Sequence, residues 1–130
     1  MSRPVLVDSS WYITKMRNGE DPLAILHLHA QSRDLATCGV VKAEVGRGVR
    51  EPDALAKLQA LWSCMLYIDD GFNRWEATLA IARELDRKGI VVPLPDIHIA
   101  ACAMHAGAVI LTYDEHFQMI PGIDATDRIF

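Results

Sequence analysis

Four short apolar runs along the chain predict the strands of a β-sheet. They cover residues 4–8, 35–38, 65–68 and 108–112, and a weaker edge strand is expected near 124–126. The runs are apolar throughout rather than alternating, which is typical of strands buried on both faces. The pattern therefore favours a parallel sheet covered by helices on both sides.

Segments with helical spacing fill the intervals between these runs. Ser9 or Ser10 is expected to cap the first helix, and Asp70 the long helix that Gly89 ends. Helices are predicted at about 10–16, 22–32, 52–62, 70–88 and 96–106, with a helical turn at 114–118. One further helix is predicted to contain Glu44 and to end at about residue 49. The long helix carries one apolar stripe, formed by Phe72, Trp75, Leu79 and Ala82.

The last long helix is predicted to start at Asp96, after a turn bracketed by Pro93 and Pro95. Its residues are apolar on nearly every side, which indicates that the helix is buried. An acid that opens so apolar a segment favours a functional role over a simple helix cap.

Length and composition fit one globular domain spanning residues 1–130. The chain is 51% hydrophobic and 23% charged, which supplies enough apolar surface for a core without disulfides. The formal net charge is −4, so the chain as a whole does not attract nucleic acid. Any nucleic-acid contact would therefore need a local basic patch or a bound metal.

Cysteine usage and hydropathy predict a cytoplasmic protein. The three cysteines are widely spaced and odd in number, which argues against a disulfide framework. The apolar run before Asp8 is too short for a signal peptide, and the longest apolar stretch is broken by His105 and Gly107. We therefore expect neither secretion nor a membrane span.

Acidic residues follow two of the predicted strands. Asp8 directly follows the first apolar run, and Asp114 comes two residues after the run that ends at residue 112. Because ligands bind outside the carboxyl ends of parallel strands, both side chains are expected at one edge of the sheet. Glu44 and Asp96 are expected at the same edge, so four carboxylates would converge.

Four converging carboxylates repel one another, and protons or a cation must balance their charge. Mg²⁺ or Mn²⁺ suits such a site, because these ions prefer oxygen ligands. Such an ion polarises a phosphodiester and lowers the pKa of an attacking water, so the pattern favours metal-assisted phosphodiester hydrolysis. The alternative is that these acids only cap helices or stand in turns.

Four motifs in this order and spacing resemble those of PIN domains, and among them the VapC-type toxins. They are VLVDSS (5–10), VVKAEVGRG (40–48), LPDIHIAACA (94–103) and LTYDEHF (111–117). The resemblance covers essentially the whole chain. It implies a three-layer α/β/α fold with a central, mainly parallel sheet of four to five strands, and a ribonuclease that requires Mg²⁺ or Mn²⁺.

The resemblance also implies roles for individual residues and partners. The catalytic and metal-binding acids of the family fall on Asp8, Glu44, Asp96 and Asp114. Ser10 and Thr112 match hydroxyl positions that orient carboxylates or water near the metal. A homodimer is implied, as is a cognate antitoxin whose C-terminal tail covers the active site. His116 departs from the family, which often has an acid there, and this leaves open whether a second metal is held.

Candidate RNA contacts come from Lys42, Arg47 and His116. The cations beside Glu44 lie near the edge of the sheet where the acids are expected, and RNA phosphates must be held there. The alternative is that these cations stand on a solvated face of their helix. His116 is a candidate for contacting phosphate or relaying a proton, although an ordinary surface position is favoured. Aromatic residues 11 and 12 can stack bases, but packing in the core or a dimer interface is favoured.

Several other functions remain open. A housekeeping RNA-processing nuclease without an antitoxin and a catalytically silent binding module would have the same fold. An aspartate-dependent phosphatase is disfavoured, because the sequence Asp8-Ser9-Ser10 lacks the second acid of an Asp-x-Asp motif. The helix face shared by residues 98, 102 and 105 offers His and Cys ligands, but no fourth zinc ligand has suitable spacing, so packing is favoured.

Overall fold

A five-stranded parallel sheet lies at the centre of the molecule. The computed structural model describes residues 2–129, and its strands are β1 (Val5–Val7), β2 (Leu35–Cys38), β3 (Leu66–Ile68), β4 (Val109–Leu111) and β5 (Ala125–Thr126). The strands lie in the order β3-β2-β1-β4-β5, and each neighbouring pair is parallel. The predicted sheet, including its weak edge strand, is confirmed.

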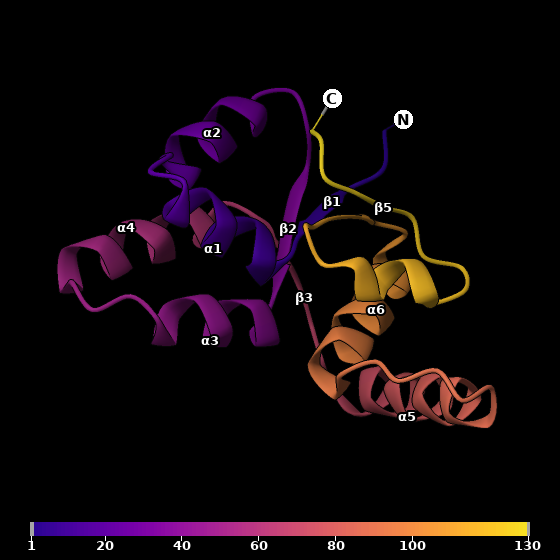
Figure 1. Cartoon of the computed structure of the whole chain (residues 1–130). Helices are drawn as coiled ribbons and strands as arrows, with labels where there is room; N and C mark the ends of the chain where they lie inside the picture. Colours follow the sequence, from indigo (N-terminus) through magenta and orange to yellow (C-terminus); the bar gives the residue numbers. More distant parts are fainter. Residues whose placement is uncertain (1, 130) are drawn as a thin grey trace.

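Helices cover both faces of this sheet, so the fold has three layers (Figure 1). One layer contains α1 (Ser9–Arg17), α2 (Pro22–His29), α3 (Gly39–Arg47) and α4 (Pro52–Ser63). The other contains α5 (Phe72–Arg87) and α6 (Leu94–Ala106), and the 3-10 helix η1 (Glu115–Met119) follows β4. Within residues 2–129, no helix is both long and apolar enough to cross a membrane.

The core lies between the sheet and the two helical layers. All residues of β1 and β2 are buried, which explains why their sequences are apolar throughout. Residues 97–103 of α6 are also buried, as predicted. On the opposite face Trp11 and Tyr12 are buried, and Nε1 of Trp62 donates a 3.0 Å hydrogen bond to the Tyr12 hydroxyl. Core packing, rather than base stacking, therefore accounts for both aromatic residues.

Helices α1 and α6 begin differently from the prediction. Asp8, rather than Ser9 or Ser10, is the N-cap of α1, because its carboxylate accepts the backbone N–H of Ser10. Helix α6 begins at Leu94, two residues before the predicted start at Asp96. A proline is tolerated there because backbone N–H groups in the first helical turn have no partner within the helix.

The predicted capping of α5 by Asp70 is wrong. Gly71 is the N-cap and forms no side-chain bond, while the Asp70 carboxylate lies 3.6 Å from Nε2 of His98. The His98 ring stacks on Trp75 with 3.8 Å between ring centroids, and its Nδ1 lies 2.9 Å from the Thr78 hydroxyl. Among the described residues, His98 belongs to no cluster of three metal ligands. Structural packing thus accounts for this histidine.

Most of the apolar stripe on α5 faces outward. Phe72 is 76% exposed, Trp75 46% and Leu79 54%. The helix instead buries Thr78 and Leu85 against the rest of the molecule. Neighbouring exposed apolar side chains of this size are typical of a surface that contacts another chain.

Candidate active site

The chain changes direction across the sheet at β1, and acidic residues gather at this point. Strand β2 pairs with one side of β1 and β4 with the other, so the carboxyl ends of β1 and β4 form a topological switch point. Asp8 follows β1 directly, and Asp114 stands three residues after β4. The backbone N–H of Asp8 donates to the carbonyl of Leu111 at 2.9 Å, which holds the two strand ends together.

Asp8 is buried and is held through only one of its carboxylate oxygens. Its Oδ2 accepts hydrogen bonds from the hydroxyls of Ser10, at 2.7 Å, and Thr112, at 2.8 Å. Each hydroxyl accepts a backbone N–H in turn, from Tyr113 and Asp114 respectively. The other oxygen, Oδ1, is buried and has no hydrogen-bond partner within residues 2–129. Because a buried, unpaired carboxylate oxygen is unfavourable, this atom is suited to binding a cation.

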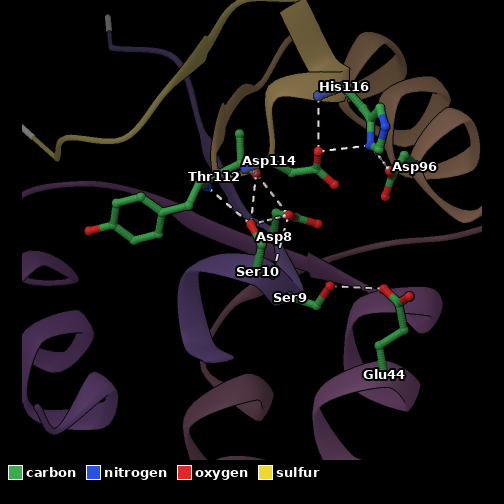
Figure 2. A network of polar contacts seen from close by, with 9 residues as sticks. Asp8, Ser9, Ser10, Glu44, Asp96, Thr112, Asp114 and His116 are labelled. Carbon is green, nitrogen blue, oxygen red and sulfur yellow. Dashed lines mark hydrogen bonds and ion pairs between the residues drawn. The ribbon is translucent and has the colours of Figure 1, made fainter. Parts of the chain in front are cut away.

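Asp96 on α6 faces Asp114 in the loop after β4 (Figure 2). Burial raises the pKa of Asp96 to about 7, and the charges of Asp114 and Asp8 act in the same direction. Burial also favours a higher pKa for Asp114, but hydrogen bonds from the His116 backbone and from Asp96 lower this pKa below its usual value. Below about pH 7 the pair therefore holds one proton between its two carboxylates.

The imidazole of His116 lies between these two carboxylates (Figure 2). Its Nδ1 is 2.9 Å from Oδ1 of Asp114 and 3.4 Å from Oδ2 of Asp96. Asp114 is also the N-cap of η1 and accepts the backbone N–H of His116. One ligand atom from each of the three side chains lies within 4.8 Å of the other two. From the sequence, His116 is a candidate for contacting phosphate or relaying a proton, with an ordinary surface position favoured, and its contact with the two acids is not predicted.

Glu44 lies beside this group rather than within it. Its Oε1 accepts a 2.9 Å hydrogen bond from the hydroxyl of Ser9, which is adjacent to Asp8 in the sequence (Figure 2). Of the four acids that the sequence predicted to converge, Asp96 and Asp114 lie in one ligand cluster, and Asp8 lies near enough for its charge to raise the pKa of Asp96. Glu44 is connected through Ser9, whose role here the sequence alone did not indicate. A direct metal-binding role for Glu44 stays a prediction.

The predicted RNA contacts on α3 line an open pocket. The Lys42 ammonium lies 5.8 Å from the ring centroid of Trp62 and 5.6 Å from that of Tyr67. Together with Arg47, these residues line a space of about 470 Å³. Tyr67 is 54% exposed, so the pocket combines cations with an accessible aromatic ring. This chemistry suits a nucleotide, although binding of RNA here stays a prediction.

The donor atoms at the sheet edge fit a small divalent cation. Three carboxylates and one imidazole nitrogen are available, from Asp8, Asp96, Asp114 and His116. Separations of 2.9 and 3.4 Å between His116 and the two acids are close to the spacing of roughly 3 Å expected for adjacent ligands in an octahedral site. Asp8 Oδ1 and His116 Nδ1 are also both buried without a hydrogen-bond partner. Ser10 and Thr112 lie where they orient the Asp8 carboxylate.

The family model of the PIN domain matches residues 5–123, and the chain therefore belongs to the PIN domain family. Comparison with curated proteins gives no match. The fold, however, is similar to several solved structures. VapBC2 from Rickettsia felis, bound to a DNA fragment from its promoter, has a TM-score of 0.77 and 21% identity, with 95% of this chain and 97% of that chain covered.

Two further structures have the same fold. DNA-bound VapBC from Salmonella typhimurium has a TM-score of 0.76 and 24% identity, with 96% of this chain and 98% of that chain covered. VapBC-5 from Mycobacterium tuberculosis, a member of the VapBC family of toxin-antitoxin systems, has a TM-score of 0.63 and 20% identity, with 96% and 97% covered. At these identities the similarity establishes the fold.

Proposed function

We propose that this chain is an endoribonuclease that requires Mg²⁺ or Mn²⁺ and serves as the toxin of a toxin–antitoxin pair. The observation that carries the proposal is the convergence of Asp8, Asp96 and Asp114 at the switch point, with Oδ1 of Asp8 buried and unpaired. Membership of the PIN domain family supports nuclease activity. The similarity to VapBC structures supports the toxin role.

Each residue of the site has a separate task in this proposal. A divalent ion, when bound, polarises the phosphodiester and lowers the pKa of the attacking water. Ser10 and Thr112 hold Oδ2 of Asp8, so that Oδ1 is directed toward the ion. The backbone N–H of His116 orients Asp114, and Asp96 must release its proton before the site carries its full negative charge. Cations on α3 hold RNA phosphates.

Two protein contacts belong to the same proposal. A cognate antitoxin is supported by the similar structures, of which one is described as a toxin–antitoxin complex from Klebsiella pneumoniae. A homodimer is supported by the exposed apolar stripe on α5, formed by Phe72, Trp75 and Leu79. A cytoplasmic location, where RNA targets are present, accords with this function.

Cleavage of a mixed RNA pool by the purified protein tests the nuclease. Reactions contain Mg²⁺, Mn²⁺ or a chelator, and compare the wild type with Asp8→Asn and Glu115→Gln. Asparagine retains one side-chain oxygen and can still cap α1, so Asp8→Asn removes charge with little change in fold. Glu115 is exposed beside the site and provides a control for loss of one nearby charge.

We expect metal-dependent cleavage by the wild type and by Glu115→Gln, and its loss in Asp8→Asn or in chelator. Cleavage that persists in chelator and in Asp8→Asn would contradict the metal mechanism. Expression in a bacterial host tests the toxin role. Growth arrest that is relieved by a neighbouring small gene distinguishes a toxin from a housekeeping nuclease, and arrest that Asp8→Asn retains would argue against a catalytic toxin.

A further inference from the structure

We propose that His116 is a nitrogen ligand of the metal, and that it gives this site a preference for Mn²⁺ over Mg²⁺. The inference rests on the proposed function only in that both concern the same metal site. It assigns a role to a residue whose side chain, unlike those of Asp8, Asp96 and Asp114, is not an acid.

The orientation of the ring is the first observation behind the proposal. The His116 side chain is 40% exposed, yet its Nδ1 atom is buried. The ring therefore directs Nδ1 inward, toward Asp114 Oδ1 at 2.9 Å and Asp96 Oδ2 at 3.4 Å. Among the described residues, Nδ1 lies within ion-pair distance of both oxygens but makes no hydrogen bond of acceptable geometry. A nitrogen held between two carboxylate oxygens without a hydrogen bond is placed as a third donor to a common cation.

The local backbone keeps this arrangement in place. The Asp114 carboxylate accepts the backbone N–H of His116 at 2.9 Å, so the acid and the histidine are oriented together. The next residue, Phe117, is fully buried and anchors η1 against the core. Because the backbone of η1 is fixed on both sides of the histidine, the imidazole needs little reorganisation to bind an ion.

The identity of the donor sets the metal preference. Mg²⁺ favours oxygen ligands and retains its waters, whereas imidazole nitrogen is a better ligand for first-row transition metals. A site with carboxylates from Asp8, Asp96 and Asp114 and one nitrogen from His116 therefore binds both ions, with Mn²⁺ favoured. An acid at position 116 would remove this preference by restoring an all-oxygen site.

Electron spin-echo envelope modulation of bound Mn²⁺ tests the nitrogen ligand directly, without relying on cleavage. The wild type is prepared unlabelled and with ¹⁵N in its histidines only, and is compared with His116→Ala, His116→Asp and the control His105→Ala. His105 is exposed at the end of α6, outside the site. Calorimetric titration with Mn²⁺ and with Mg²⁺ gives the two affinities for each protein.

We expect the wild type and His105→Ala to show a directly coordinated nitrogen whose coupling changes on histidine ¹⁵N labelling. His116→Ala should lose this coupling and bind Mn²⁺ at least about tenfold more weakly, with a smaller change for Mg²⁺. His116→Asp should recover Mn²⁺ binding without the nitrogen coupling, and its ratio of Mn²⁺ to Mg²⁺ affinity should fall.

Two results would overturn the inference, and they differ in what else they contradict. Mn²⁺ bound to the wild type without histidine coupling would mean that the imidazole only neutralises the acids, and the proposed nuclease would stand. Failure of the wild type to bind either ion would contradict both this inference and the metal-dependent function.

Discussion

The hydroxyl of Thr112 donates a 2.8 Å hydrogen bond to Oδ2 of Asp8, which lies 104 positions earlier in the sequence. This bond joins the ends of β4 and β1 at the switch point. Ser10 donates to the same oxygen, so both hydroxyls bind one side of the carboxylate and leave Oδ1 without a partner. The acid is thereby oriented before any metal binds, which reduces the reorganisation required for binding.

Thr112→Val should weaken metal binding while retaining the fold. Valine has nearly the same shape but lacks the hydroxyl, which leaves the backbone N–H of Asp114 without its acceptor. We expect a loss of Mn²⁺ affinity of about 10- to 100-fold, which is typical when a residue that orients a metal ligand is removed. We also expect a loss of about 1–3 kcal/mol in the free energy of unfolding. Calorimetric titration and urea unfolding measure the two effects.

Thr126→Val is the matched control for this substitution. Among the described residues, the Thr126 hydroxyl bonds with the nearby backbone of Arg128 and with no acid, although Thr126 lines the same pocket as Asp114. Its replacement should leave Mn²⁺ affinity unchanged. Equal affinities for Thr112→Val and Thr126→Val would show that the hydroxyl does not prepare Asp8 for binding.

Metal affinity should fall as pH falls through neutrality. Burial and the neighbouring carboxylates raise the pKa of Asp96 to about 7, so protons compete with the metal below this pH. We expect up to about a tenfold loss of Mn²⁺ affinity per pH unit below pH 7, because one proton must be released. Titration at pH 8, 7 and 6 measures the slope, and Asp96→Asn should flatten it. A constant affinity over this range would contradict the raised pKa.

The same shift should make the metal-free protein less stable as pH rises from about 4 to about 7. The folded-state pKa of Asp96 is near 7, whereas the ordinary value is 3.8. Between these values the folded protein holds a proton that the unfolded chain has released, so the free energy of unfolding decreases with rising pH. Urea unfolding in chelator measures the free energy of unfolding of the wild type and of Asp96→Asn. The stability of the variant relative to the wild type should be greater at pH 8 than at pH 5.

Glu44→Gln should weaken metal binding less than Asp114→Asn does. Glu44 is bonded to Ser9 and lies outside the cluster of Asp96, Asp114 and His116. Both substitutions remove one charge and retain a side-chain oxygen, so their Mn²⁺ affinities are directly comparable by titration. An equal or larger loss for Glu44→Gln would place Glu44 among the ligands, as the sequence resemblance implied.

Phe72→Asp should shift the proposed homodimer toward monomer. Phe72 is 76% exposed, so an acid there should leave the chain folded while it introduces an unpaired charge into the apolar stripe. Light scattering coupled to size exclusion measures the mass of the wild type, Phe72→Asp and the control Asn73→Asp. The control adds the same charge to the adjacent exposed residue, off the stripe. A Phe72→Asp protein that stays dimeric would exclude this face of α5 as the contact.

The positions of Asp8 and Asp114 were predictable from the sequence because they depend on strand order and strand ends alone. Continuous apolar runs located β1 and β4, and parallel strands place ligands at their carboxyl ends. The burial of α6 followed in the same way from its apolar sequence, and with it the approach of Asp96 to the other two acids. These features follow from periodicity and topology.

The contacts that the sequence missed depend on side-chain direction. His116 reaches the acids because η1 turns its ring inward, and Glu44 is connected through Ser9 because of its position on α3. Asp70 does not cap α5 because the chain enters the helix at Gly71, which leaves the carboxylate free to approach His98. Such details are decided by backbone angles and tertiary packing, which one sequence does not reveal.

The pairing of β1 with β4 also bears on when the candidate site can assemble during folding. Val5 pairs with Val109, so this part of the sheet closes a very long loop and carries the corresponding entropic cost. A chain in which only β1, β2 and β3 have assembled holds Asp8, but it has not yet brought Asp114 to the same edge. If the proposed nuclease function holds, the capacity to cut RNA would therefore appear only once β4 has joined β1, and a chain stalled before that step would be inactive.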